Sequence, residues 1–152
     1  MVWFGLAAAI CGEDLFFKSY VKACVRENSE KKLIGDKVIL TRVYNRGAML
    51  GWMDDAPEML RGITMLGIGS LTGALAACGS EKGHVCRKLG LSLMLGGAAS
   101  NAWERMKDGK VTDYIRFNAG PEKFRRIVFN KGDFAVFAGS LLLIVGEMIH
   151  GK

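Results

Sequence analysis

The 152-residue sequence predicts an all-α membrane protein, a single domain over residues 1–152 with four transmembrane helices. Half of the residues are hydrophobic, and they gather in four apolar segments. There are 20 glycines and only 2 prolines, and glycine lets membrane helices approach one another closely. The mean hydropathy of +0.18 is low for several spans. A soluble helical bundle, with core helices that end at charged residues, is therefore the competing fold.

The first apolar segment, Met1 to Gly12, is expected to belong to a retained helix that continues to about Cys24. It lacks the basic n-region of a signal peptide. Ile10, which precedes Cys11, is larger than the small residue that a lipoprotein signal has at that position. Three charged residues follow within a turn or two, as expected inside a longer helix.

The second apolar segment follows a polar stretch, Arg26 to Glu58. Within it the β-branched stretch Lys37 to Tyr44, with Val38 to Val43 at its centre, predicts a strand. The segment itself, Gly62 to Ser80, is 19 residues without a charge. That length reaches the ~18 residues needed to span a membrane. Glu81 to Lys88 is then expected to be a short basic turn.

The last two apolar segments, Leu89 to Trp103 and Phe134 to Gly146, are shorter. Like the first, they reach spanning length only if neighbouring ionisable residues are included, and such residues inside a membrane are costly and usually functional. Between these two segments, Arg105 to Asp133 carries 12 charged residues in 29 and contains the loop signal Asn118 to Pro121. We expect this stretch to be a long charged loop.

The formal net charge of +6 requires an anionic partner. The basic residues flank apolar segments and no nucleic-acid motif accompanies them, which favours membrane lipid headgroups and no nucleic acid. Basic residues on both sides of the apolar segments leave the orientation open. The four cysteines show neither CxxC nor zinc spacing, so no metal site is expected.

Polar residues at the end of the third segment, Asn101, Glu104 and Arg105, fall on one helical face. A solvated helix end explains such a face equally well. Two carboxylates, Asp113 and Asp133, then stand at the edges of apolar stretches. Brought together they would share a proton and could activate a water, although a loop acid and a helix N-cap are the simpler interpretations.

Five short motifs, in this order and spacing, resemble those of signal peptidase II, the prolipoprotein signal peptidase family, of which the chain looks like a divergent member. They are DxxxK at Asp14–Lys18, NxGA at Asn45–Ala48, GGAxxNxxDR at residues 96–105, VxDF at Val111–Tyr114 and FNxAD at Phe129–Asp133. Each is weak alone, but their joint occurrence across nearly the whole chain is specific.

The resemblance implies four transmembrane helices with both termini cytoplasmic and a small extracytoplasmic β-sheet, the β-cradle, containing Val38 to Val43. It implies a multi-pass aspartic endopeptidase of the bacterial cytoplasmic membrane, with its active site toward the extracytoplasmic face. The enzyme would cut lipid-modified prolipoprotein precursors just before the diacylglyceryl-modified cysteine. It would need no metal or cofactor and would bind globomycin-type inhibitors.

The resemblance also assigns roles to individual residues. The catalytic aspartates are Asp113 and Asp133. Residues that line the site or lie near bound substrate are Asn45, Gly47, Asn101, Arg105 and Asn130. Residues expected to give structural support are Asp14, Lys18 and Glu104.

Several positions depart from the family pattern. Glu104 replaces an aspartate and is expected to pair with Arg105 or another basic group; Gly132 replaces an alanine. Tyr114 replaces a phenylalanine, and the aromatic residue after NxGA is represented only by Met49 and Leu50. Both catalytic aspartates are present, which predicts an active enzyme. The alternatives are a non-cleaving homologue that binds lipidated peptides and a small carrier that uses intramembrane carboxylates.

Overall fold

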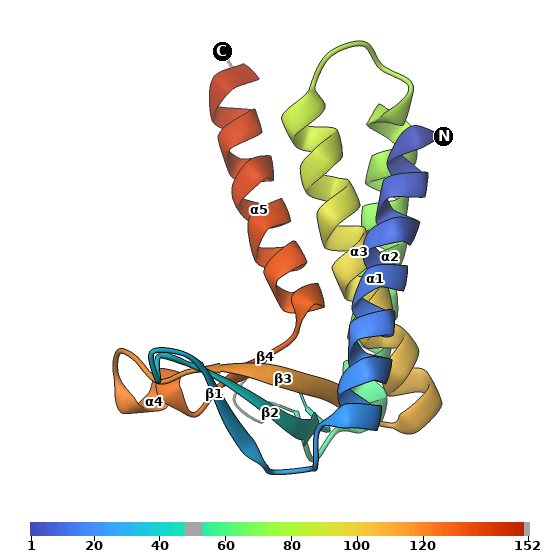
Figure 1. Cartoon of the computed structure of the whole chain (residues 1–152). Helices are drawn as coiled ribbons and strands as arrows, with labels where there is room; N and C mark the ends of the chain where they lie inside the picture. The colour runs from blue at the N-terminus through green and yellow to red at the C-terminus, as the bar shows by residue number, and fades with distance from the viewer. Residues whose placement is uncertain (48–52, 151–152) are drawn as a thin grey trace.

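The computed structural model describes residues 1–47 and 53–150 and shows a mostly helical chain with one small antiparallel sheet. The long helices are α1 (Val2–Cys24), α2 (Pro57–Gly79), α3 (Val85–Asp108) and α5 (Lys131–His150). The other elements are β1 (Glu30–Ile34), β2 (Val38–Asn45), β3 (Val111–Phe117), the short α4 (Glu122–Arg125) and β4 (Val128–Phe129). The long helices stand side by side with the sheet across one end, and both termini lie at the other end (Figure 1).

All four apolar segments are helical, and each helix extends beyond its segment into charged residues. α2 begins with Pro57 at its first turn, where the missing N–H costs no hydrogen bond. α3 continues through its polar end until Gly109, whose φ of +68° suits glycine and stops the helix. The polar ends are therefore parts of the helices and not of the loops.

The expectation of a long charged loop between Arg105 and Asp133 is wrong, because this stretch contains β3, α4 and β4. The sheet order is β1-β2-β3-β4 with antiparallel neighbours. The predicted strand Val38 to Val43 is confirmed within β2, and β3 pairs along it. Their register places Val43 opposite Asp113. The sheet thus brings the NxGA and VxDF segments together, although 68 positions separate Asn45 from Asp113.

Close backbone contacts join α3 to its neighbours, and glycine makes them possible. A Cβ on Gly96 would lie 2.6 Å from the carbonyl oxygen of Ala7 on α1. A Cβ on Gly97 would lie 2.3 Å from the carbonyl oxygen of Gly132 on α5. Any side chain at these positions would force the helices apart. The adjacent glycines therefore hold both α1 and α5 against α3.

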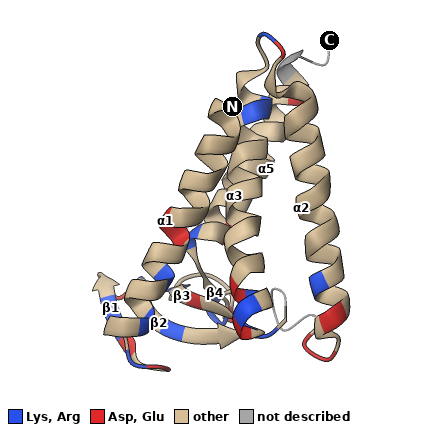
Figure 2. Ribbon diagram, turned by 90° about the vertical axis from the view of Figure 1, so that its right-hand side faces the viewer, with Lys and Arg blue, Asp and Glu red and all other residues tan. Residues whose placement is uncertain are grey.

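The distribution of polarity is the reverse of that in a soluble bundle. Large apolar side chains on the outer faces of the helices are exposed, among them Phe16, Leu66, Leu141 and Met148. Asp14, Lys18, Ser92, Ser100, Glu104 and Arg105 are instead buried between the helices. Charged residues otherwise gather toward the two ends of the bundle (Figure 2). Among the described residues, α2 is the one helix whose length and composition alone suffice to cross a membrane.

Candidate active site

A pocket of about 1080 Å³ opens where the helices meet the sheet. Its polar lining includes both predicted catalytic aspartates, Asp113 on β3 and Asp133 in the first turn of α5. The predicted substrate-contacting residues also line it: Asn45, Gly47, Asn101, Arg105 and Asn130. The structure thus brings seven of the ten predicted site residues to one pocket.

The start of α5 is stabilised by a reciprocal pair of hydrogen bonds between Asn130 and Asp133. The backbone N–H of Asp133 donates to the Asn130 side-chain oxygen at 2.9 Å. The backbone N–H of Asn130 donates to Oδ2 of Asp133, also at 2.9 Å. This arrangement is a capping box, with Asn130 at the N-cap and Asp133 three residues later. The simpler interpretation of Asp133 as the N-cap is therefore wrong, because Asn130 occupies that position.

Asn130 also connects the two aspartates. While its side-chain oxygen serves the cap, its Nδ2 donates to Oδ1 of Asp113 at 2.7 Å. Because Asn130 is buried and uses its amide in both directions, the distance between β3 and the first turn of α5 is fixed. One residue thus holds both carboxyl groups in the pocket, that of Asp113 through its side chain and that of Asp133 through its backbone N–H.

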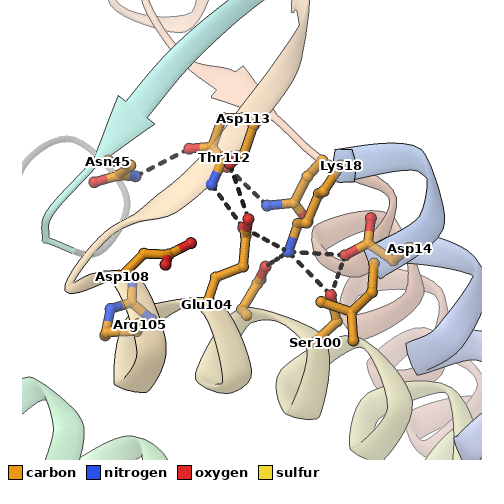
Figure 3. A network of polar contacts seen from close by, with 12 residues as sticks. Asp14, Lys18, Asn45, Ser100, Glu104, Arg105, Asp108, Thr112 and Asp113 are labelled. Carbon is orange, nitrogen blue, oxygen red and sulfur yellow. Dashed lines mark hydrogen bonds and ion pairs between the residues drawn. The ribbon is translucent and has the colours of Figure 1, made fainter. Parts of the chain in front are cut away.

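Asp113 is 4% exposed and accepts a second hydrogen bond from Nδ2 of Asn45 at 3.2 Å (Figure 3). Burial, followed by the negative charge of Asp133, raises the pKa of Asp113 from 3.8 to about 7. The hydrogen bonds from Asn130 and Asn45 act in the opposite direction. Asp113 therefore holds a proton near neutral pH, and two adjacent carboxyl groups can carry one proton between them.

The polar face at the end of α3 does not point to solvent. Asn101 donates from Nδ2 to Oδ1 of Asp133 at 2.9 Å. Arg105 donates from Nη2 to the backbone oxygen of Gly47 at 2.7 Å, which holds the segment after β2 over the pocket. Ala48, the last residue of the NxGA motif, lies outside the described residues, as do Met49 and Leu50. Asn101 and Arg105 thus support opposite sides of the pocket.

Glu104 lies away from the pocket and pairs with lysines of α1 instead of Arg105. Its carboxylate is 2.5 Å from Nζ of Lys22 and 3.5 Å from Nζ of Lys18. It also accepts the backbone N–H of Thr112 at 2.8 Å and the Thr112 hydroxyl at 2.9 Å (Figure 3). Because Thr112 directly precedes Asp113, Glu104 anchors the end of β3 that lines the pocket.

Asp14 and Lys18 form an ion pair of 2.9 Å whose side chains are each 1% exposed. The pair lies between α1 and α3, since Ser100 donates to Asp14 and accepts from Lys18 at 3.0 Å. The hydroxyl of Tyr114 donates to Oδ1 of Asp14 at 3.2 Å and accepts the N–H of Lys131 at 3.1 Å. The motif of α1 is thus in contact with α3, β3 and the start of α5.

Three residues of this site are not predicted from the sequence: Ser100, Thr112 and Tyr114. Lys22, a partly exposed partner of Glu104 outside the pocket, is also not singled out by the sequence. Tyr114 was noted only as a departure from the family pattern, yet its hydroxyl connects two buried groups. Ser100 precedes Asn101 and Thr112 precedes Asp113, so a hydroxyl beside a predicted polar residue is the signal that the sequence offers. Within residues 1–47 and 53–150, no group of three or more His, Cys, Asp or Glu side chains is placed to hold a metal ion.

Comparison with known proteins agrees with this geometry. Residues 6–149 match the signal peptidase II family, described as Signal peptidase (SPase) II. Proteins named lipoprotein signal peptidase from Burkholderia cenocepacia and Burkholderia multivorans are 37% identical over 113 residues. The match covers 72% of this chain and 65% of each relative, so the chain spans about two thirds of their length.

The fold also matches solved structures. Two structures, each described as a bacterial membrane enzyme studied by the in meso method, superpose with TM-scores of 0.77 and 0.76. The first superposition covers 97% of this chain and 90% of the solved chain, at 19% sequence identity. The second covers 98% of this chain and 94% of the solved chain, at 18% sequence identity. With a family match over nearly the whole chain, a shared fold and close sequence relatives, this chain belongs to the signal peptidase II family.

Proposed function

We propose that this protein is a membrane aspartic endopeptidase that removes the signal peptide from diacylglyceryl-modified prolipoproteins, cutting just before the lipidated cysteine. The observation that carries the proposal is the junction at Asn130. There, two carboxyl groups from β3 and α5 are held in one pocket by the side-chain amide and the backbone N–H of one residue. Family membership and the names of the relatives support the substrate class.

In the proposed hydrolysis, Asp133 removes a proton from water and Asp113 donates a proton to the substrate. Asp133 accepts N–H donors from Asn101 and Asn130 and stands in the first turn of α5, where the helix dipole favours a negative charge, so we assign it as the base. It takes a proton from a water whose oxygen attacks the scissile carbonyl. Asp113, which holds a proton near pH 7, donates toward the carbonyl oxygen. When the C–N bond breaks, a proton passes to the leaving amine and a new carboxyl group remains.

The remainder of the pocket suits a lipidated peptide. Beside the charged lining residues Lys123 and Arg126, apolar side chains from the start of α5 and the segment before it line part of the pocket. These apolar residues are Ile127, Val128, Phe129, Val136 and Phe137. An acyl chain or an apolar peptide segment can pack against them, while Asn45 and Arg105 offer donors to the peptide backbone. The pocket thus combines a polar reacting end with an apolar binding wall.

We further propose that α1, α2, α3 and α5 all cross the bacterial cytoplasmic membrane as one domain. Among the helices of residues 1–47 and 53–150, α2 alone passes on composition, and the other three carry charged residues near the pocket. Asp14, Lys18, Glu104 and Arg105 are buried between helices, so they do not face lipid. The apolar outer faces of the helices support this placement.

The arrangement of the ends supports an extracytoplasmic site. Both termini and the turn between α2 and α3 share the end of the bundle away from the sheet (Figure 1). If that end is cytoplasmic, the sheet, α4 and the pocket mouth lie at the outer surface, where a translocated precursor presents its cleavage site. Lys82, Arg87 and Lys88 near the turn then agree with the excess of basic residues in cytoplasmic loops.

Incubating the purified protein with a lipidated precursor tests the proposal. Mass spectrometry should show cleavage just before the lipidated cysteine, and globomycin should block it. The same precursor without the diacylglyceryl group is the control and should remain uncut. Absence of any cleavage of the lipidated precursor by a folded protein would contradict the proposal.

A further inference from the structure

The ammonium group of Lys18 reaches beyond its partner Asp14. Its Nζ donates to Oδ1 of Asn101 at 2.6 Å, a shorter contact than its 2.9 Å ion pair with Asp14. Asn101 in turn donates from Nδ2 to Asp133 at 2.9 Å. A continuous chain of contacts therefore runs from α1, through α3, to the carboxyl group at the start of α5.

The chemistry of the three groups determines the direction of this chain. An ammonium group only donates hydrogen bonds, so it must face the oxygen of the Asn101 amide. The NH₂ group of the same amide is then directed at Asp133. With the amide turned over, its oxygen would face a carboxylate and its NH₂ would face an ammonium, and both contacts would be repulsive. Lys18 thus selects the one amide orientation that supports Asp133.

The position of Lys18 makes this selection strong. Its side chain is 1% exposed, so the ammonium group has protein acceptors in place of bulk water. Ser100 accepts from the same ammonium at 3.0 Å, and Glu104 lies 3.5 Å away (Figure 3). These acceptors hold Nζ at the end of its long chain in one place. If Lys18 only stabilised α1, its i,i+4 ion pair with Asp14 would be sufficient, and the contact with Asn101 would not be needed.

We propose that Lys18 is a positioning residue for peptide hydrolysis, which acts through Asn101 to orient the carboxyl group of Asp133 toward the attacking water. The proposal rests on the proposed function, since it concerns the geometry of that reaction. It extends the expected structural role of Lys18 to a role in the chemical step. Loss of Lys18 should therefore lower kcat more than it raises KM, because the pocket wall that binds substrate is unchanged.

Lys18→Met keeps the length of the side chain but removes its donors. Lys18→Met alone leaves Asp14 buried without its cation, so a second variant, Asp14→Asn/Lys18→Met, removes both charges. The new amide can accept from Tyr114 through its oxygen and donate through its NH₂ to the Ser100 hydroxyl oxygen that Lys18 contacted. Lys22→Met is the matched control, because Lys22 lies one turn further on α1 and contacts the same Glu104 but not Asn101. Folding is checked by thermal unfolding in detergent and by globomycin affinity.

We expect both Lys18 variants to lose ~100-fold in kcat, the size of effect that a misplaced catalytic group produces, with KM and globomycin affinity within ~3-fold of wild type. Lys22→Met should stay within ~3-fold in kcat. Adding Lys18→Met to Asn101→Ala should cost little further, because both remove the same support.

Three results would overturn the inference alone in an active wild-type background. They are a folded Asp14→Asn/Lys18→Met protein with near wild-type kcat, a rise in KM at unchanged kcat, and full additivity with Asn101→Ala. A wild-type protein that leaves the lipidated precursor uncut would instead overturn the proposed function, and the inference with it.

Discussion

At Asp113, burial and the nearby charge of Asp133 together raise the pKa of the carboxyl group to about 7. Asn130 and Asn45 oppose this by donating to the charged form. The residue thus stands where small changes in hydrogen bonding alter its protonation at physiological pH. The sequence predicts Asp133 as its partner, but only the structure shows that Asn130 connects the two residues.

This balance predicts the pH dependence of cleavage. If Asp113 donates the proton, kcat/KM falls as the pH rises through about 7, because the acid form of the free enzyme is lost. Asn45→Ala removes a donor that lowers the pKa of Asp113, so the fall should move to higher pH. Asn118→Ala, which removes an exposed contact at the far end of the sheet, is the control. A pH profile that is the same in wild type and Asn45→Ala would contradict the assignment of Asp113 as the acid.

Glu104 gives a second prediction for a single residue. Glu104→Gln should lower the free energy of unfolding by about 1–3 kcal/mol, because an amide cannot accept from Thr112 and the lysines together without turning a donor toward one of them. Its kcat should fall by about tenfold or less, since the carboxylate anchors β3 without touching substrate. Thermal unfolding and cleavage rates on one preparation test this. Complete loss of cleavage in a stable Glu104→Gln protein would place Glu104 among the catalytic acids.

Among the elements, the helices and β2 were predictable, whereas β1 and β3 were not. Apolar segments and a β-branched stretch are local signals, and they located the four long helices and β2. All five residues of β1 are exposed, so this edge strand carries no apolar alternation. The first four residues of β3 are buried together, Asp113 included, where α1 and α3 contact the strand. These two strands form because each pairs with β2 in the folded chain, and no local sequence pattern predicts that pairing.

The contact between α3 and α5 predicts a sharp difference between two glycines. Gly97→Ala would bring a methyl group 2.3 Å from the backbone oxygen of Gly132, so it should destabilise the protein by about 1–3 kcal/mol and reduce activity by shifting the start of α5. Gly67→Ala, on α2 with no neighbour within 4 Å of the added Cβ, is the control and should change stability by less than about 1 kcal/mol. Unfolding midpoints in detergent compare the two. Equal midpoints would contradict the close helix contact.

The whole molecule separates its polar groups into a buried site and two charged ends. Composition alone indicated only one clear span, because Asp14, Glu104 and Asp133 interrupt the apolar segments from which the pocket is built. The family motifs predicted that these charges belong to a site, and the structure buries Asp14 and Glu104 between helices and places Asp133 in the pocket lining. The overall hydropathy was low for this physical reason.

The proposed topology predicts which ends of the molecule can be reached from outside an intact cell. In a variant whose native cysteines are replaced, a single cysteine at Asn118, at the sheet end, should react with an impermeant thiol reagent. A single cysteine at Ser80, after α2, should react only once the membrane is opened. Both side chains are exposed in the structure, so access and not burial decides the labelling. Labelling at Ser80 but not at Asn118 in intact cells would reverse the arrangement.

The central claim, that Asp113 and Asp133 form one catalytic unit, is tested most directly by the cleavage rates of Asp113→Asn, Asp133→Asn and the double variant on a lipidated precursor. A neutral amide cannot exchange the proton, so each single variant should lose on the order of 10⁴-fold in kcat or more, and the double variant should lose little beyond that. All three should remain folded and inserted in membranes. Near-normal cleavage by either single variant would contradict the aspartic mechanism.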